Sequence, residues 1–272
     1  MFIKAWRENV NSFELYRYPK SRLATFDVGR IGNKKHHIAG LLEIDVSLAR
    51  EKIRSAIKSG RKISFTSWML KVISNTIVQN RLIHSINHKK RTQVAFNDVD
   101  ISIPLEREVD GVRVPLATVI RKTNTKTIEE IHGEIRKASS RQISGEKDYV
   151  LEKRGSEALN RLFFNLPQFL RMMIWRYLLS NPFVRKDTMG TVMVTNIGTA
   201  GKFPVWILPK SIHNLCIGIG SISKKPWVHD NKIVIREILN LTLLFDHDVV
   251  DGMPAARFTD KLVKNIEQAM DL

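Results

Sequence analysis

One apolar run near the C-terminus constrains the fold more than any other segment. Leu239 to Leu244 precedes Phe245-Asp246-His247-Asp248-Val249-Val250-Asp251-Gly252, and a helix-like segment, Pro254 to Met270, follows. This pattern predicts a buried strand that delivers His247 to a strand–loop–helix junction, where a rigid scaffold exposes it. Histidine is well suited to take a proton from a thiol or hydroxyl near neutral pH. Spacing alone fits a core histidine with a helix-capping Asp251 equally well.

Periodicity along the rest of the chain predicts alternating strands and helices. Strands are expected at residues 36–45, 99–105, 112–120, 191–195, 215–222 and 233–245. Helices are expected at residues 47–60, 65–77, from 127 onward and 254–270. Ser47 should cap the first helix, Thr127 and Glu130 should form a capping box, and turns are expected at Asp110-Gly111 and Asp230-Asn231. The last strand should break between Glu237 and Asn240. Because helices alternate irregularly with hairpin-linked strands, the sheet should be mixed rather than doubly wound parallel.

Composition limits the compartment and the partners. The chain has 272 residues, 43% of them hydrophobic, which favours a folded globule. The single cysteine, Cys216, lies in an apolar run, so we expect a buried, inert thiol in a reducing cytoplasm. Met1 to Val10 shows no signal-peptide pattern, which also favours the cytoplasm. A net charge of +17 favours an anionic partner, and the candidates are coenzyme A phosphates, an acidic carrier domain, an anionic membrane or nucleic acid.

Three segments resemble a known family. Asp246-His247, with Asp251-Gly252 and then Ala255-Ala256-Arg257-Phe258, is similar to the active-site segment of the 2-oxo acid dehydrogenase acyltransferases, which are dihydrolipoamide acyltransferase cores related to chloramphenicol acetyltransferase. Gly190-Thr191-Val192-Met193-Val194-Thr195-Asn196-Ile197-Gly198 is similar to the family's Gly-Thr-(apolar)-Ser/Thr-Asn-x-Gly strand. Asp110-Gly111-Val112-Arg113-Val114-Pro115 is similar to its Gly-Leu-x-x-Pro-Val strand. The segments follow the family's order.

The resemblance implies both a fold and a reaction. The expected fold is a single-domain α/β, chloramphenicol acetyltransferase-like mixed-sheet sandwich with flanking helices at residues 36–272, after a basic N-terminal arm at residues 1–35. The expected reaction moves an acyl group between coenzyme A and a dihydrolipoyl-like thiol or another nucleophile, without an acyl-enzyme. Coenzyme A thioester is then a substrate, and no covalently bound cofactor is expected.

The resemblance also assigns roles to individual residues. His247 is the expected general base, and Thr195 is the expected hydroxyl donor to the oxyanion. Asp251 should order the loop that holds His247. Asn196 and Gly252 are expected at the substrate, and Gly252 should permit a tight turn into the helix.

A shared site and external carriers are expected as partners. In relatives the histidine and the hydroxyl donor come from different subunits of a trimer, so a homotrimer or a higher oligomer is implied. The lipoyl modules that precede the core in full-length relatives are not expected here, so a lipoyl or acyl carrier domain would act in trans. Asp248 replaces the family's usual arginine, and its carboxylate could raise the pKa of His247 or point to solvent.

The resemblance leaves an insertion at about residues 150–188. Within residues 162–179 one helical face is apolar, flanked or interrupted by arginines; it comprises Leu162, Leu166, Phe169, Leu170, Met173, Ile174, Tyr177 and Leu178. Pro167 and Pro182 should bound the helix. Packing on its own domain or on a neighbouring subunit is the favoured expectation, and membrane contact is the alternative.

Other classes of function are disfavoured. The possible metal ligands are His36-His37, His84 with His88, and Asp246-His247-Asp248. His84 and His88 share a helical face but lack the intervening glutamate of a zinc hydrolase motif, and they lie in a basic stretch expected at the surface, so no metal site is predicted. Nucleic acid is not expected as a partner. The alternative function is an inactive scaffold, or an anionic-surface-binding protein, that retains the fold. The joint presence of His247, Thr195, Asn196 and Asp251-Gly252 favours an enzyme.

Overall fold

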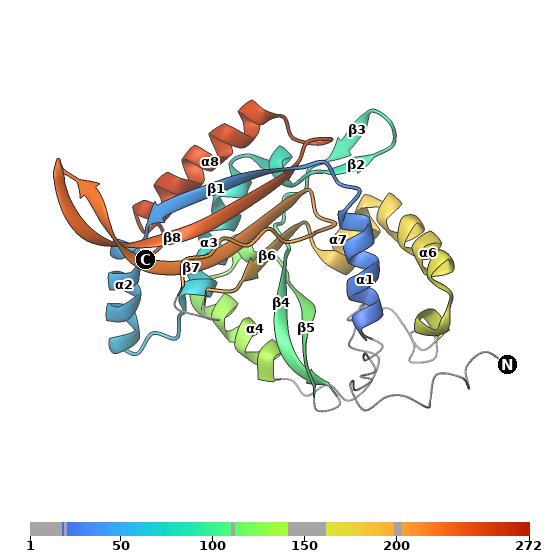
Figure 1. Cartoon of the computed structure of the whole chain (residues 1–272), viewed down its shortest axis with the longest axis horizontal. Helices are drawn as coiled ribbons and strands as arrows, with labels where there is room; N and C mark the ends of the chain where they lie inside the picture. Colours follow the sequence, from blue (N-terminus) through green and yellow to red (C-terminus); the bar gives the residue numbers. More distant parts are fainter. Residues whose placement is uncertain (1–17, 19–20, 110–111, 141–161, 199–202) are drawn as a thin grey trace, which may run out of the picture.

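A six-stranded mixed sheet forms the centre of the molecule (Figure 1). The computed structural model describes residues 18, 21–109, 112–140, 162–198 and 203–272. The strand order is β1-β8-β7-β6-β4-β5, with β1 at His37–Asp45, β4 at Ile101–Val109, β5 at Val112–Ile120, β6 at Val192–Asn196, β7 at Leu215–His229 and β8 at Lys232–Asp246. Strand β6 lies parallel to β7 and β4, and the other neighbouring pairs are antiparallel. The predicted mixed sheet is confirmed.

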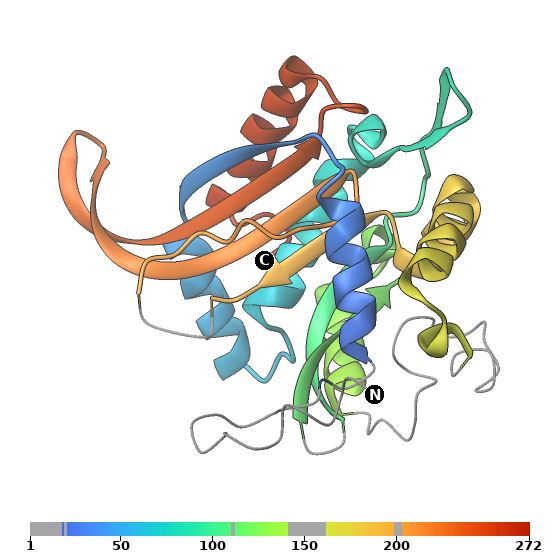
Figure 2. The same cartoon turned by 45° about the vertical axis from the view of Figure 1, so that its right-hand side comes forward.

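Two groups of helices flank this sheet. A layer on one face holds α2 (Ser47–Lys58), α3 (Phe65–Val78), α4 (Ile128–Ser140) and α8 (Gly252–Glu267). At one side of the molecule, on the right in Figures 1 and 2, lie α1 (Ser21–Gly32), α6 (Gln168–Ser180), α7 (Pro182–Met189) and a small hairpin, β2 (Ile86–His88) with β3 (Thr92–Val94). The described residues also include the 3-10 turns η1 (Arg81–His84) and η2 (Thr123–Thr125). Helix α1 falls within the expected basic arm.

The core forms between the first helix layer and the sheet. Helix α3 buries Trp68, Met69, Val72, Ile73 and Ile77, as its periodicity predicts. The Trp68 indole N–H donates to the Met270 carbonyl (2.8 Å), so the largest core side chain also fixes the chain end. From α8, Phe258, Leu262 and Ile266 complete this layer.

Several local predictions are confirmed. Asp230 and Asn231 join β7 to β8 with positive φ values of 49° and 59°, as a tight hairpin turn requires. Thr127 and Glu130 form the capping box of α4: the Thr127 N–H donates to Glu130 Oε2 (2.7 Å), and the Glu130 N–H donates to Thr127 Oγ1 (3.2 Å). The predicted turn at Asp110-Gly111 lies outside the described residues.

Two local predictions are wrong. Strand β8 continues through Glu237 and Asn240, where Glu237 pairs with Arg54 (3.0 Å) and Asn240 Nδ2 reaches Ser221 Oγ (3.4 Å). The irregularity falls instead on β7, between Ile219 and Ile222. Ser47 is the first residue of α2 rather than its cap, since its N–H donates to the Asp45 carboxylate and its hydroxyl accepts from the Glu237 N–H.

Helix α6 is bounded by Pro167 and Pro182 as predicted, but within one copy of the chain most of the predicted apolar face is exposed. Arg171 and Trp175 face the protein, whereas Phe169 and Met173 are each 65% exposed and Tyr177 is 78% exposed. The sequence could not show this, because the buried Arg171 guanidinium depends on its pair with Asp27 of α1 (2.8 Å), far away in the chain, and on a bond to the Leu166 carbonyl (2.8 Å).

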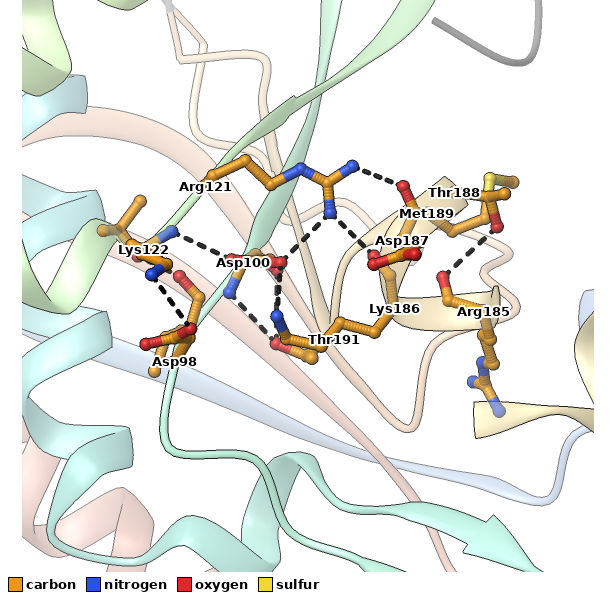
Figure 3. Close-up of polar contacts among 12 residues, drawn as sticks. Asp98, Asp100, Arg121, Lys122, Arg185, Lys186, Asp187, Thr188, Met189 and Thr191 are labelled. Carbon is orange, nitrogen blue, oxygen red and sulfur yellow. Dashed lines mark hydrogen bonds and ion pairs between the residues drawn. The ribbon is translucent and has the colours of Figure 1, made fainter. Parts of the chain in front are cut away.

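A buried carboxylate ties α7 to the sheet (Figure 3). Asp100, 1% exposed, pairs with Lys186 and Arg121 at 3.0 Å each and accepts the Lys122 N–H at 2.9 Å. Burial opposes ionisation of Asp100, but the Lys122 N–H, Lys186 and Arg121 outweigh it and hold the pKa of Asp100 below its usual value. Its backbone carbonyl also accepts the Thr191 N–H at the start of β6 (2.8 Å).

Asp100→Asn should destabilise the fold by about 2–3 kcal/mol, because it leaves two cations beside a neutral amide, while partial exposure of Arg121 limits the cost. Asp98→Asn is the matched control: it removes only a more exposed pair with Lys122 and should cost less than about 1 kcal/mol. Urea unfolding measures both. Since folding lowers the pKa of Asp100, the wild-type advantage exists above the unfolded-state pKa and disappears as the pH falls through the folded-state pKa. Equal stability of Asp100→Asn and wild type at neutral pH would contradict this role.

Candidate active site

His247 stands on a loop between β8 and α8, the predicted strand–loop–helix junction. Strand β8 ends at the buried Asp246, residues 247–249 form a turn, and α8 begins at Gly252. The His247 N–H donates to the His36 carbonyl (2.9 Å), while its side chain is exposed. The backbone is therefore anchored and the imidazole is accessible.

Lys35 and His36, the two residues directly before β1, each contact a carboxylate next to His247. Lys35 Nζ lies 2.5 Å from Asp246 Oδ2, and His36 Nδ1 lies 2.9 Å from Asp248 Oδ1. The hydrogen bond with Asp248 raises the pKa of His36. Asp248, the departure from the family pattern, therefore pairs with His36. Sequence reasoning missed both holding residues, because only the register that pairs His37 with Asp246 brings them to the loop.

A buried cation lies beneath the same loop. Arg185 of α7 donates to Asn214 Oδ1 (3.1 Å), which also accepts from Lys35 (3.0 Å). Burial lowers the pKa of Arg185 to about 10, and the Asp246 charge opposes this shift. Burial and then the charge of Arg185 lower the pKa of Lys35. Asp246 thus balances buried positive charge directly before His247, a role that no local sequence pattern signals.

Thr195 and Asn196 end strand β6. Thr195 is 7% exposed, and its hydroxyl makes no hydrogen bond to the described part of the chain. The neighbouring amide is fully engaged: Asn196 Nδ2 donates to Thr66 Oγ1 (2.9 Å), and its Oδ1 accepts the Gly198 N–H (2.8 Å). Asn196 therefore fixes the backbone beside a hydroxyl that is free to donate elsewhere.

Within one chain, His247 and Thr195 lie far apart. Thr195 pairs with Gly218, and Gly218 pairs with Thr242. His247 follows Thr242 by five residues, so strand geometry places it about 16 Å further along the sheet and about 10 Å across it. A single copy therefore separates the two residues by roughly 19 Å.

Asp251 and Gly252 share the loop with His247. Asp251 takes the N-cap position of α8 without a side-chain cap bond, while its carbonyl accepts the Ala255 N–H (3.1 Å). The expected conformational need for glycine at position 252 is wrong: Gly252 lacks a positive φ, and an added Cβ would meet no atom within 4 Å. The space beside the Cα of Gly252 is therefore not filled by other atoms of the described chain.

Cys216 and His84, which the sequence offered as candidate functional residues, are buried in the fold. Cys216 is fully buried, and burial raises the pKa of its thiol to about 12, so the predicted inert thiol is confirmed. His84 is buried, contrary to the expected surface position; its ring lies 3.0 Å from Thr191 Oγ1 and 3.2 Å from the Phe96 carbonyl oxygen, and burial lowers its pKa to about 4. No set of three metal-ligand side chains gathers among the described residues.

The chain is similar to known proteins of one family. Residues 37–148 and 185–272 match the family of 2-oxoacid dehydrogenases acyltransferase (catalytic domain). The dihydrolipoyllysine-residue acetyltransferase component of the pyruvate dehydrogenase complex of Bacillus subtilis is 25% identical over 233 residues, which cover 82% of this chain and 43% of that protein. The chain spans less than half the length of the curated relatives it matches in this way.

Solved structures share the fold. A probable dihydrolipoamide acetyltransferase from Listeria monocytogenes has a TM-score of 0.69 at 17% identity, covering 96% of this chain and 97% of that chain. The dihydrolipoamide acetyltransferase of Azotobacter vinelandii has a TM-score of 0.64 at 18% identity, covering 93% and 92%. The chain belongs to the family of 2-oxoacid dehydrogenase acyltransferase catalytic domains.

Proposed function

We propose that the protein transfers an acyl group directly between coenzyme A and a nucleophilic acceptor, in a site shared by two copies of the chain. The observation that carries this proposal is the exposed imidazole of His247 on a loop anchored by Lys35 and His36, within the matched range 185–272. In the A. vinelandii enzyme, the residues investigated for their catalytic role are a serine, a histidine and an asparagine. They have the same spacings along that chain as Thr195, His247 and Asp251 have here.

The chemistry follows from these residues. The His247 imidazole takes the proton of the acceptor thiol while the sulfur attacks the thioester carbon. The carbonyl oxygen becomes an oxyanion, to which the Thr195 hydroxyl donates. Collapse of the intermediate breaks the bond to the coenzyme A sulfur, and the imidazolium returns its proton to that leaving thiolate. No acyl-enzyme forms, because both substrates meet in one site. Asp251 supports the end of the loop through its carbonyl, which accepts the Ala255 N–H at the start of α8. The space beside Gly252 and the backbone fixed by Asn196 receive the substrates.

Two features of the chain support a shared site. The roughly 19 Å between Thr195 and His247 in one copy is too long for both to reach one carbonyl group, so the partner residue must come from a second copy. In addition, β7 and β8 continue as a two-stranded ribbon, Lys224–His229 with Lys232–Glu237, whose Val228, Ile233 and Ile235 are 69–78% exposed. Since isolated ribbons are marginally stable, a neighbouring subunit should cover these side chains. A trimer or a larger cage is the proposed assembly.

The acceptor class follows from the relatives. Names of relatives refer to dihydrolipoyl groups, so a dihydrolipoyl thiol presented by a separate carrier domain is the first candidate here. Coenzyme A enters as a substrate. Amines, hydroxyls and other carrier thiols are the remaining acceptors to test.

Mass spectrometry of purified protein with pairs of acyl-CoA and acceptor tests this proposal. The expected result is an acylated acceptor and free coenzyme A in equal amounts, with no mass increase of the protein when acceptor is omitted. A stable acyl-protein would contradict direct transfer. Absence of transfer for every pair, with folded protein, would favour the inactive scaffold.

A further inference from the structure

One face of α6 is apolar and exposed, and contacts on the opposite side of the helix hold it in place. Phe169, Met173 and Tyr177 recur every four residues and so share one helical face, here called the docking face. The opposite side of α6 is fixed by the buried Arg171–Asp27 pair and by Trp175, which is 1% exposed and packs edge-on against Phe163. Large aromatic and aliphatic side chains held in water in this way mark an interaction surface.

The segment that carries the docking face has basic residues and no acidic ones. Residues 162–186 contain no aspartate or glutamate, and Arg176 is exposed beside Tyr177. Three consecutive exposed cations, Lys89, Lys90 and Arg91, form the tip of the β2–β3 hairpin. This hairpin lies on the same side of the molecule as α6 in Figures 1 and 2.

The β2–β3 hairpin packs against α7, which in turn contacts α6. Phe96, two residues after β3, meets Phe183 of α7 edge-on, with ring centroids 5.9 Å apart. Lys186 of α7 lies over the same Phe96 ring. The β2–β3 hairpin, α7 and α6 therefore form one packed structural unit on this side of the molecule.

We propose that this unit docks on an anionic phospholipid membrane, with the docking face in the interfacial region and the hairpin tip at the headgroups. Tyrosine and phenylalanine suit the boundary between headgroups and acyl chains, and cations near it are attracted by anionic lipids. No helix in the described ranges is long and apolar enough to cross a bilayer. The same segment of a second copy, residues 162–186, would be equally free of acidic residues, so it complements the docking face less well than an anionic membrane does.

Flotation of the full chain with vesicles tests this docking. Wild type should float with phosphatidylcholine vesicles enriched in phosphatidylglycerol, should stay in solution with phosphatidylcholine alone, and should detach as salt increases. Met173→Asp with Tyr177→Asp should weaken binding by at least about tenfold, and so should Lys89→Glu with Lys90→Glu and Arg91→Glu. Both sets of side chains are exposed, so sedimentation velocity should show an unchanged assembly.

The matched control is Leu48→Asp with Ile57→Asp, which places the same charges at exposed apolar positions of α2; it should bind vesicles as wild type does. Failure of wild type to bind anionic vesicles, or undiminished binding by the α6 variant, would overturn the proposal. A smaller assembly for the α6 variant would overturn it too, because another copy would then cover the docking face. Vesicle binding needs no turnover, so its outcome is independent of the proposed acyl transfer.

Discussion

His247→Ala should lower turnover by at least about a hundredfold, because the attacking thiol or hydroxyl loses the group that takes its proton. The free energy of unfolding should change by no more than about 0.5 kcal/mol, since the imidazole is exposed and the His247 backbone bond to His36 remains. Steady-state kinetics with the best acyl-CoA and acceptor pair, together with urea unfolding, measure both quantities.

His132→Ala is the matched control for this variant. His132 lies on α4, remote from the loop, and its Nδ1 has no hydrogen-bond partner to lose among the described residues. Its turnover should equal that of wild type. Full activity of a folded His247→Ala protein would remove the general-base assignment.

Thr195→Val should lower turnover by about a hundredfold or more, because one donor to the oxyanion is lost at nearly constant side-chain volume. The fold should be retained, since the hydroxyl makes no hydrogen bond within the described part of the chain. The loss should fall on kcat, with KM for acyl-CoA almost unchanged, because the oxyanion exists only near the transition state.

Thr195→Ser keeps the hydroxyl and should retain most of the activity. A variant series in which Thr195→Val raises only KM, with kcat intact, would make the hydroxyl a substrate anchor rather than a transition-state donor.

Sequence patterns predicted most of the sheet because its strands are either continuous apolar runs or hairpins with strong turn residues. The Asp230-Asn231 turn adopts the positive φ values that asparagine and aspartate tolerate. The predicted break in β8 failed because Glu237 and Asn240 have side-chain partners on other segments, which periodicity cannot reveal.

The buried polar contacts were the part that sequence could not predict. Arg171 interrupts an apolar pattern, and only its partner Asp27, far away in the chain, shows that this side of α6 faces inward. Lys35 and Arg185 were equally hidden, since their burial depends on Asp246 and Asn214. The sequence motif of the loop identified His247. The residues that hold the loop, Lys35 and His36, could be identified only once the register between β1 and β8 was known.

Mixing His247→Ala chains with Thr195→Val chains tests the shared site most directly. Each variant alone should be almost inactive, whereas in a mixed assembly one chain can supply the histidine and its neighbour the threonine. With equal amounts and random exchange, about a quarter of the sites should regain both residues, and activity should recover to about that fraction of wild type. Mass analysis of differently labelled chains confirms that subunits have exchanged. Recovery of activity is the predicted result; no recovery despite proven exchange would contradict a site built from two copies.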